Sequence, residues 1–263
     1  ALDSNKTEEL RAKAAKKGET LNPADIQGIS REEILNDFYK VVEYTQTKKG
    51  WKTDFQPDHQ RVGKINRDIV DAKTGKVVAA EGAKMNARFA RKLYEEGLRE
   101  ISVPADDLLG QYIANDLINE ATGEIFAEAG DEITPDILEA FENQGIKTIP
   151  VLDIDHVNVG AYLRNTLAID KNNSREDALM DIYRVLRPGE PPTVEGAEVL
   201  FNNLFFDFER YDLSAVGRVK MNSRLNLDCP DTVRVLRKQD LIEIVRVLLD
   251  LKDGRGEVDD IDN

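Results

Sequence analysis

Two similar stretches, IVDAKTGKVVA at residues 69–79 and LINEATGEIFA at residues 117–127, decide the fold expected for the middle of the chain. They lie 48 positions apart, and the same shift aligns Gly82 with Gly130. Apolar residues also agree at this shift along residues 63–151. Self-similarity at a fixed spacing is the sequence signature of a repeated structural unit. We therefore expect two copies of one unit.

Each copy predicts a strand hairpin, a helix and a further strand. The Thr-Gly pair suits a hairpin turn, because glycine adopts positive φ without strain. A helix of about ten residues should follow and end at Gly97 or Gly145, with Thr134 and Pro135 as a helix start in the second copy. Because two such copies can cover each other's apolar faces, residues 45–155 are predicted to form a compact α+β module. This module is either a pseudo-symmetric binding cleft or a duplicated scaffold.

Helices are predicted on both sides of this module. Residues 7–17 are strong helix formers. Ser30 and Glu33 form a capping-box pattern that begins a helix running to about residue 42. From residue 156 onward, helix starts at Ser174 and Thr193 predict further helices.

The two most informative carboxyl-terminal helices have apolar residues at helical spacing. The helix after Ser174 should bury a stripe of Ala178, Leu179, Ile182, Tyr183 and Leu186, and the last helix should end near Gly254. The fold class is therefore α+β. A mostly helical but discontinuous domain (1–44 and 156–250) is interrupted by the strand-containing module (45–155) and followed by an acidic end (251–263).

Composition describes a hydrophilic globular protein. Of 263 residues, 41% are apolar and 33% are charged, and mean hydropathy is -0.47. No apolar stretch is long enough for a membrane span and no secretion signal precedes the first helix, so we expect neither membrane insertion nor secretion. The single Cys229 cannot form an internal disulfide. The net charge of -14 argues against a general nucleic-acid coat but not against local contact.

Motifs for catalysis are missing from the sequence. It has no phosphate-binding loop, no dinucleotide fingerprint and no nucleophile elbow. With two histidines and one cysteine, ligands for zinc are scarce. His156, between Asp153 and Asp155 on one side and a helical region on the other, is either a general base or a junction histidine bonded to the backbone.

The acidic end, GEVDDIDN at residues 256–263, has three interpretations. Asp260 and Asp262 are two positions apart, which resembles a magnesium-binding pattern. The segment can equally be a solvated tail. A carboxylate can also accept a hydrogen bond from a base amino group in a DNA interface.

Arg187 is the other candidate. A cation at a helix end complements the helix dipole, and this alone accounts for an arginine there. The following PGEPP sequence also restricts where the guanidinium points, which suits contact with a phosphate or an unstacked base.

MDIYRVLRPGEPPTVEGAEVLFNNLFFDFERYDLSAVGRVKMN at residues 180–222 and LLDLKDGRGEVDDIDN at residues 248–263 closely resemble the beta subunit of bacterial DNA-directed RNA polymerase. The resemblance implies that residues 1–44 and 156–250 form the lobe on one wall of the DNA cleft. Residues 45–155 are then a lineage-variable insertion, and residues 251–263 lead into the fork loop. Residues 225–239 are implied to be a variable connector without an assigned role.

The resemblance also implies the site residues. The position of Asp262 belongs to a pocket that recognises a guanine of the nontemplate strand, and Arg187, with Glu190 nearby, lies along the path of single-stranded nontemplate DNA. The catalytic aspartates and their magnesium belong to the beta-prime subunit. We therefore expect no catalytic residue, metal or cofactor in this chain, and no activity from the chain alone.

The implied partners are the beta-prime, alpha and sigma subunits and DNA, with accessory transcription factors on the insertion, in the bacterial cytoplasm at the nucleoid. An alternative is an independent protein-interaction module whose duplicated domain binds a partner. A third is a metal-dependent phosphoryl-transfer enzyme, in which Asp260 and Asp262 would chelate the metal.

Overall fold

A computed structural model of the chain describes residues 30–259, apart from residues 49, 61, 119–122, 124 and 173. It mixes helices and strands, as the predicted α+β class requires. Contacts divide the chain into two compact units: Leu35–Ile154, and a second unit that contains the chain from Asp155 onward together with Ser30 to Ile34 of the described residues. The helix predicted over residues 7–17 lies outside the described residues.

The first described helix, α2 (Arg31–Phe38), begins with the predicted capping box. Ser30 Oγ accepts from the Glu33 N–H at 3.1 Å, and Glu33 Oε2 accepts from the Ser30 N–H at 2.9 Å. The predicted end of this helix near residue 42 is wrong. Val41 already begins a strand, because its β-branched side chain fits a pleated sheet and it pairs with Leu152.

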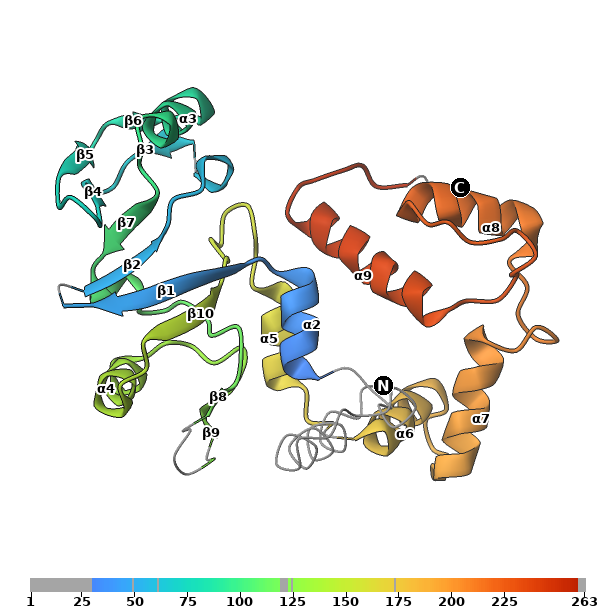
Figure 1. The fold of residues 1–263 in the computed structure, drawn as a ribbon. Helices are drawn as coiled ribbons and strands as arrows, with labels where there is room; N and C mark the ends of the chain where they lie inside the picture. The colour runs from blue at the N-terminus through green and yellow to red at the C-terminus, as the bar shows by residue number, and fades with distance from the viewer. Residues whose placement is uncertain are drawn as a thin grey trace, which may run out of the picture. The chain divides into compact units, whose positions relative to one another are not determined.

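A six-stranded antiparallel sheet forms the centre of the Leu35–Ile154 unit (Figure 1). Its order is β10 (Thr148–Leu152), β1 (Val41–Thr47), β2 (Gly50–Asp54), β7 (Glu100–Val103), β4 (Ile69–Asp71) and β5 (Val77–Ala79). Strands β1 and β2 were not predicted from the sequence. Two small ladders flank the sheet: β3 (Gly63–Lys64) with β6 (Lys84–Met85), and β8 (Leu117–Ile118) with β9 (Ile125–Ala127).

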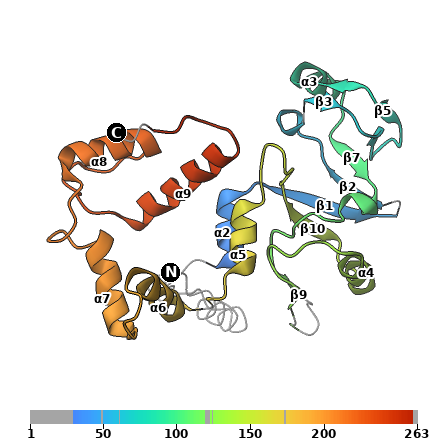
Figure 2. The ribbon, with the colours of Figure 1, turned by 180° about the vertical axis from the view of Figure 1, so that it is seen from behind.

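Two helices complete this unit, α3 (Ala87–Glu95) and α4 (Pro135–Gln144). Figures 1 and 2 show α3 beside β3 and α4 beside β10. The Asn86 side chain caps α3, and Thr134 Oγ1 accepts from the Ile137 N–H at 3.4 Å, as predicted for the start of α4. Short 3-10 turns lie at Pro57–His59 and Ala105–Asp107.

Each of these helices covers its own apolar core. The core at α3 consists of Phe55, Met85, Ala90, Leu93 and Leu98. The core at α4 consists of Trp51, Leu108, Ile113, Ala127, Ile133, Phe141, Ile149 and Val151. The unit therefore has two apolar cores, one at each helix, and the six-stranded sheet joins them.

Hydrogen bonds recur at the 48-residue spacing. Asp68 Oδ1 accepts from the Glu81 N–H at 2.7 Å, and Asp116 Oδ1 accepts from the Ala129 N–H at the same distance. Backbone bonds also recur, from the N–H of Gly82 to Ile65 O and from that of Gly130 to Ile113 O. The glycines after α3 and α4 both have positive φ, +107° at Gly97 and +68° at Gly145.

The second unit is helical in its described part after residue 155. Its helices are α5 (Tyr162–Ile169), α6 (Arg175–Leu186), α7 (Val194–Phe205), α8 (Ser214–Leu225) and α9 (Lys238–Lys252). The predicted caps are confirmed: Ser174 Oγ accepts from the Asp177 N–H, and Thr193 Oγ1 accepts from the Gly196 N–H, each at 3.1 Å. The end of α9 also matches, with Gly254 at φ +78°.

The buried stripe predicted for α6 is only partly correct. Leu179 is buried, but Leu186 is 50% exposed and Ala178, Ile182 and Tyr183 are half-buried. Helix α6 packs against α7, and the ion pair of Arg175 with Glu198 joins them. Leu186 is the last residue of α6. Among the described residues, no helix is both long and apolar enough to cross a membrane.

Candidate nucleic-acid interface

The end of α6 is a defined turn that positions Arg187. The Arg187 N–H closes the helix by donating to Tyr183 O at 2.8 Å. The chain then turns at Gly189, whose φ of +93° favours a residue without Cβ. The Glu190 N–H donates to Arg187 O at 3.3 Å, so the two residues predicted as site residues face each other across the turn.

One carboxylate connects three side chains at this turn. Glu190 Oε2 accepts from the Tyr183 hydroxyl at 2.8 Å and lies 3.4 Å from Arg187 Nη1. The hydrogen bond from Tyr183, followed by that from Arg187, holds the pKa of Glu190 below its ordinary value. The same bond to Glu190 raises the pKa of Tyr183. The sequence predicted Arg187 and Glu190, but it assigned Tyr183 to the buried stripe and missed this role.

Arg187 remains open to solvent in this arrangement. Its side chain is 52% exposed, and that of Glu190 is 56% exposed. Exposed ion pairs contribute little free energy, so a phosphate can displace Glu190 from the guanidinium at small cost. Glu190 thus restrains the direction of the Arg187 guanidinium and leaves it accessible to solvent. This contact acts on the side chain itself, whereas the sequence analysis expected the restraint to come from the following PGEPP segment.

Asp262, the third predicted site residue, lies outside the described residues, as does Asp260. The chain before them is anchored. Arg224 on α8 donates to Asp259 Oδ2 from Nε and to Glu257 O from Nη2, both at 2.8 Å. These bonds join a side chain and the backbone of the acidic end to α8 as far as Asp259.

A second arginine anchors the start of this segment. Arg255 pairs with Asp250 at 2.7 Å and with Asp253 at 3.1 Å, and it donates to Asn158 O at 2.8 Å. Hydrogen bonding to Asp250 raises the pKa of Arg255. The Gly160 N–H also donates to Asp253 Oδ1 at 3.0 Å. These contacts join the loop before α5 to the end of α9.

The described residues hold no group of three or more His, Cys, Asp or Glu side chains that could bind a metal ion. Asp155 is one of the two aspartates beside His156 in the general-base alternative, but its carboxylate stabilises a turn. Its carboxylate accepts backbone N–H groups of Val157, Asn158 and Val159. Burial raises the pKa of Asp155, but the bond from Val159 and the others outweigh burial and lower it. His156 has φ +58° and donates its N–H to Val159 O.

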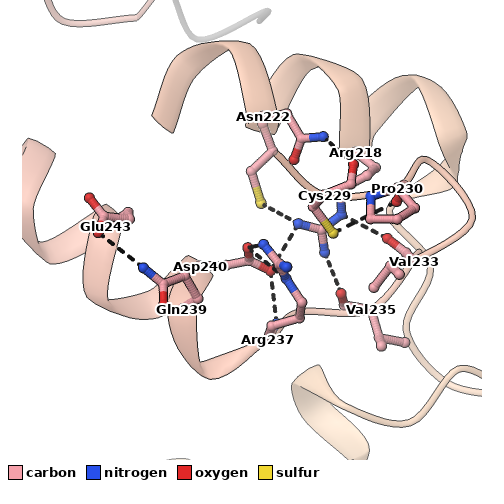
Figure 3. Close-up of polar contacts among 11 residues, drawn as sticks. Arg218, Asn222, Cys229, Pro230, Val233, Val235, Arg237, Gln239, Asp240 and Glu243 are labelled. Carbon is pink, nitrogen blue, oxygen red and sulfur yellow. Dashed lines mark hydrogen bonds and ion pairs between the residues drawn. The ribbon is translucent and has the colours of Figure 1, made fainter. Parts of the chain in front are cut away.

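Arg218 on α8 is a fully buried charged residue of the second unit, and Figure 3 shows its polar contacts. Its Nη1 lies 2.9 Å from Asp240 Oδ2, and its Nε donates to Val233 O at 2.7 Å. Nη2 donates to Val235 O. Since this guanidinium is fully buried, it cannot contact a nucleic acid and serves the packing of the chain between α8 and α9.

A second arginine also donates hydrogen bonds to Asp240. Its carboxylate accepts one from the Arg237 N–H at 2.8 Å and one from Arg237 Nη2 at 2.9 Å (Figure 3). Burial alone raises the pKa of Asp240, but the hydrogen bonds of Arg237 and Arg218 outweigh burial and lower it. No role was predicted for the connector at residues 225–239, which supplies the carbonyls of Val233 and Val235. No periodicity or motif links Arg218 to Asp240, so no sequence signal for this pair was available.

The sequence model of the family described as RNA polymerase Rpb2, domain 2, matches residues 136–263. The match includes the Arg187 turn, the buried Arg218 pair and the anchored end of the chain. The matched residues thus belong to the class of RNA polymerase subunit domains.

Curated relatives give the particular subunit. The DNA-directed RNA polymerase subunit beta of Caulobacter vibrioides (strain NA1000 / CB15N) is 56% identical over 236 residues, and that of Rhizobium leguminosarum bv. trifolii is 55% identical over 236 residues. That of Dinoroseobacter shibae is 52% identical over 248 residues. Each match covers 90% of this chain. The chain belongs to the family of bacterial RNA polymerase beta subunits, and it spans 17% of the length of the Caulobacter relative.

Proposed function

We propose that the second unit forms a noncatalytic lobe on one wall of the polymerase DNA cleft and helps to hold melted DNA during transcription. The exposed Arg187 guanidinium, directed by Glu190 at the end of α6, is the observation that carries this proposal. A directed, accessible cation suits a phosphate or an unstacked base. The net charge of -14 is compatible with this role, because other parts of the enzyme would neutralise most phosphates.

In this proposal the chemistry belongs to other chains. The beta-prime subunit holds the catalytic magnesium, and the alpha and sigma subunits complete the enzyme, in the cytoplasm at the nucleoid. Asp262 accepts a hydrogen bond from a nontemplate guanine. The contacts of Arg224 and Arg255, which hold the chain before Asp262, support this role. The chain alone should not transfer nucleotides to an RNA end when supplied with DNA template, nucleoside triphosphates and magnesium. Synthesis by the pure chain would overturn this assignment.

The Leu35–Ile154 unit is, in the same proposal, a duplicated insertion in the lobe. Support comes from hydrogen bonds that recur 48 residues apart, including those of Asp68 and Asp116. Accessory transcription factors are the proposed partners of this insertion. Because β1 begins at Val41 and pairs with β10, the sheet of the insertion includes residues before the boundary at residue 45.

The test of the DNA role is Arg187→Ala in the reconstituted polymerase. We expect shorter-lived open promoter complexes, with the loss growing as salt is lowered, because a phosphate contact is removed. Arg184→Ala is the matched control, since Arg184 is an exposed arginine of the same helix that pairs with Asp181. Equal lifetimes for wild-type enzyme and Arg187→Ala would reject Arg187 as a DNA contact.

The alternative function, an independent protein-interaction module, is favoured by one observation: Leu35–Ile154 is a compact unit with its own two cores. A pull-down from the polymerase-containing fraction, with the isolated unit as bait, tests it. Retention of a factor that does not bind the helical unit supports the alternative, and recovery of no specific factor contradicts it.

A further inference from the structure

The two predicted copies of the repeat differ in the sign of their charge. Residues 63–103 contain nine Lys and Arg against six Asp and Glu, a net charge of +3. Residues 111–151, which lie 48 positions later, contain one Lys against nine Asp and Glu, a net charge of -8. The whole chain has a net charge of -14, so residues 63–103 are a basic segment of an acidic protein. Such a segment indicates contact with an anionic partner.

Two lysines of this segment face each other across the ladder of β3 and β6. Lys64 on β3 is directly opposite Lys84 on β6, and both residues are exposed. Directly opposed residues of an antiparallel pair have Cβ atoms about 4.5–5.5 Å apart, and like charges at such positions repel each other. Neither ammonium has an ion-pair or hydrogen-bond partner among the described residues. The ladder therefore contains a repulsion that a bound anion would relieve.

Helix α3, which directly follows β6, adds two arginines. Ala90 and Leu93 form its buried face, whereas Arg88 and Arg91 are exposed. Residues three apart are neighbours on a helix surface, with Cβ atoms about 5–6 Å apart. Arg91 pairs with Asp58 at 3.3 Å, and both of these side chains are largely exposed. The guanidinium of Arg88 has no ion-pair partner in the part of the chain that the structure describes.

The lysines and the arginines lie near one another. Four positions separate Lys84 from Arg88, so their Cα atoms are at most about 14 Å apart. Met85 of β6 and Leu93 of α3 share one apolar core, and Figure 1 shows α3 beside β3 and β6. We call the four cations together the basic surface: Lys64, Lys84, Arg88 and Arg91.

The acidic segment indicates that these positions do not need cations for folding. Three of the four have an acidic and exposed residue 48 positions later: Glu132 for Lys84, Asp136 for Arg88, and Glu139 for Arg91. Glu132 forms a bridge with Tyr112, just as Lys84 pairs with Lys64. Asp136 lies in the first turn of α4, as Arg88 does in α3. Because the same backbone arrangement forms with either charge, the basic residues point to a partner of this surface.

The spacing of the cations favours DNA over an acidic peptide. An extended peptide presents a side chain to one surface only about every 7 Å, because alternate side chains point to opposite sides. B-DNA carries one phosphate per about 1.7 Å of its axis, and its phosphates line grooves about 6–12 Å wide. Cations that are neighbours within the ladder and within the helix are therefore matched better by the dense charge of a DNA duplex.

We propose that the basic surface binds the phosphate backbone of double-stranded DNA without reading its sequence. Lys64, Lys84 and Arg88 donate to phosphate oxygens, and Arg91 exchanges Asp58 for a phosphate at small cost, since exposed ion pairs contribute little. Phosphate contacts position a protein on the duplex and carry no base information. The basic surface belongs to the Leu35–Ile154 unit, so this proposal does not rest on the proposed contact of the other unit with melted DNA.

The first test is the affinity of the full 263-residue chain for a short labelled duplex of mixed sequence, measured by fluorescence anisotropy between about 50 and 200 mM salt. Lys84→Glu and Arg88→Asp each introduce the residue found 48 positions later. Each variant should bind more weakly and lower the slope of log Kd against log salt by about 1, the value for one lost phosphate contact. A wild-type chain without saturable binding, or variants that bind as wild type does, would overturn the proposal.

Lys48→Glu is the matched control, because it changes the net charge by as much as Lys84→Glu. Lys48 is exposed in the turn between β1 and β2, at the opposite end of β2 from the turn at Pro57–His59 that contacts α3. It should leave the salt slope unchanged, and a loss equal to that of Lys84→Glu would show general charge attraction and overturn the proposal. Polyglutamate that displaces the duplex as well as unlabelled DNA does would favour an acidic protein partner instead.

The same variants separate a lost contact from a lost fold. Lys84→Glu replaces the repulsion with Lys64 by an attraction. Arg88→Asp places an acid in the first turn of α3, where the helix dipole favours negative charge. The urea midpoint of this unit, followed by the fluorescence of Trp51 in its core, should therefore stay equal or rise while DNA binding weakens. A lower midpoint in both variants would mean that the cations serve folding, which contradicts the proposal.

The second test uses the reconstituted polymerase on promoter DNA with long duplex arms. A photo-crosslinking residue replaces Ala87, which is exposed in α3 directly before Arg88. A second enzyme carries the same residue in place of Asp136 on the acidic segment. Crosslinks to DNA from position 87 and not from position 136 support the proposal. No crosslink to DNA from position 87, or equal crosslinks from both positions, would overturn it.

Discussion

Arg218 Nη1 and Asp240 Oδ2 lie 2.9 Å apart, and neither side chain has any exposed surface. The carbonyls of Val233 and Val235 accept the other donors of the guanidinium. A buried charge requires such compensation, since removing one partner leaves the other charged and unpaired in a medium of low polarity. The course of the chain between α8 and α9 therefore depends on this pair.

Asp240→Asn should lower the free energy of unfolding of the helical unit by about 3–5 kcal/mol, the usual cost of breaking a buried ion pair from one side. Urea unfolding followed by circular dichroism measures it. The single Trp51 lies in the core of the other unit, so its fluorescence gives a separate transition that should move less.

Asp181→Asn is the matched control for this change. Asp181 pairs with Arg184 at the surface of α6, where both side chains are at least half exposed. The expected loss is below about 1 kcal/mol, as for exposed ion pairs in general. If Asp240→Asn costs no more than Asp181→Asn, the buried pair does not stabilise the unit.

The helical unit should lose stability in acid through Asp240. Its hydrogen bonds hold the folded-state pKa below the unfolded value of about 3.9, so its contribution is complete above about pH 4. The contribution is lost as the pH falls below the unfolded pKa and through the folded one. Free energies of unfolding from about pH 6 to 3 should therefore fall more steeply for wild type than for Asp240→Asn. Parallel curves would contradict this role.

Tyr183→Phe should raise the pKa of Glu190 toward its ordinary value, because the phenol is the largest cause of its lowering. Carboxyl-carbon NMR of Glu190 during a pH titration measures it. Tyr211→Phe is the control, since Tyr211 packs against Phe205 at the carboxyl end of α7. An unshifted Glu190 titration in Tyr183→Phe would mean that the hydroxyl does not hold this turn in solution.

Asp262→Ala in the complete polymerase should weaken the preference for guanine at one nontemplate position. The expected loss of discrimination is about 1–3 kcal/mol, the contribution of one good base contact. Competition between promoters that differ only at that position measures it. The proposed guanine contact is wrong if the variant retains the wild-type preference.

Local features of the chain were predictable because neighbouring residues produce them. The caps at Ser30, Ser174 and Thr193 depend on a side chain and a backbone N–H three residues apart, so short patterns suffice. Glu190 was taken as a site residue from the resemblance to the family, and its contact with Arg187, three positions before it, is local. The contact of Tyr183 with Glu190 was missed because the helical spacing of apolar residues assigned Tyr183 to the buried stripe of α6.

Contacts between distant residues were not predictable in the same way. The helix expected through residue 42 became strand β1, because Val41 and Val42 pair with residues more than a hundred positions away. The same limit applies to contacts within the predicted repeat. The shift of 48 positions does not indicate that the Ala114 N–H donates to Pro150 O on β10.

By itself the sequence determined the α+β class, the helix caps and the membership in the polymerase beta-subunit family, and it predicted the repeat of 48 residues. All of these reside in local patterns or in similarity along the chain. Only the tertiary structure decided that Arg218 is buried while Arg187 is exposed. Both are arginines in or next to helices, and the charge of each would by itself favour exposure to solvent. The carbonyls and the carboxylate that surround Arg218 come from residues 15 to 22 positions away, and the fold alone brings them together.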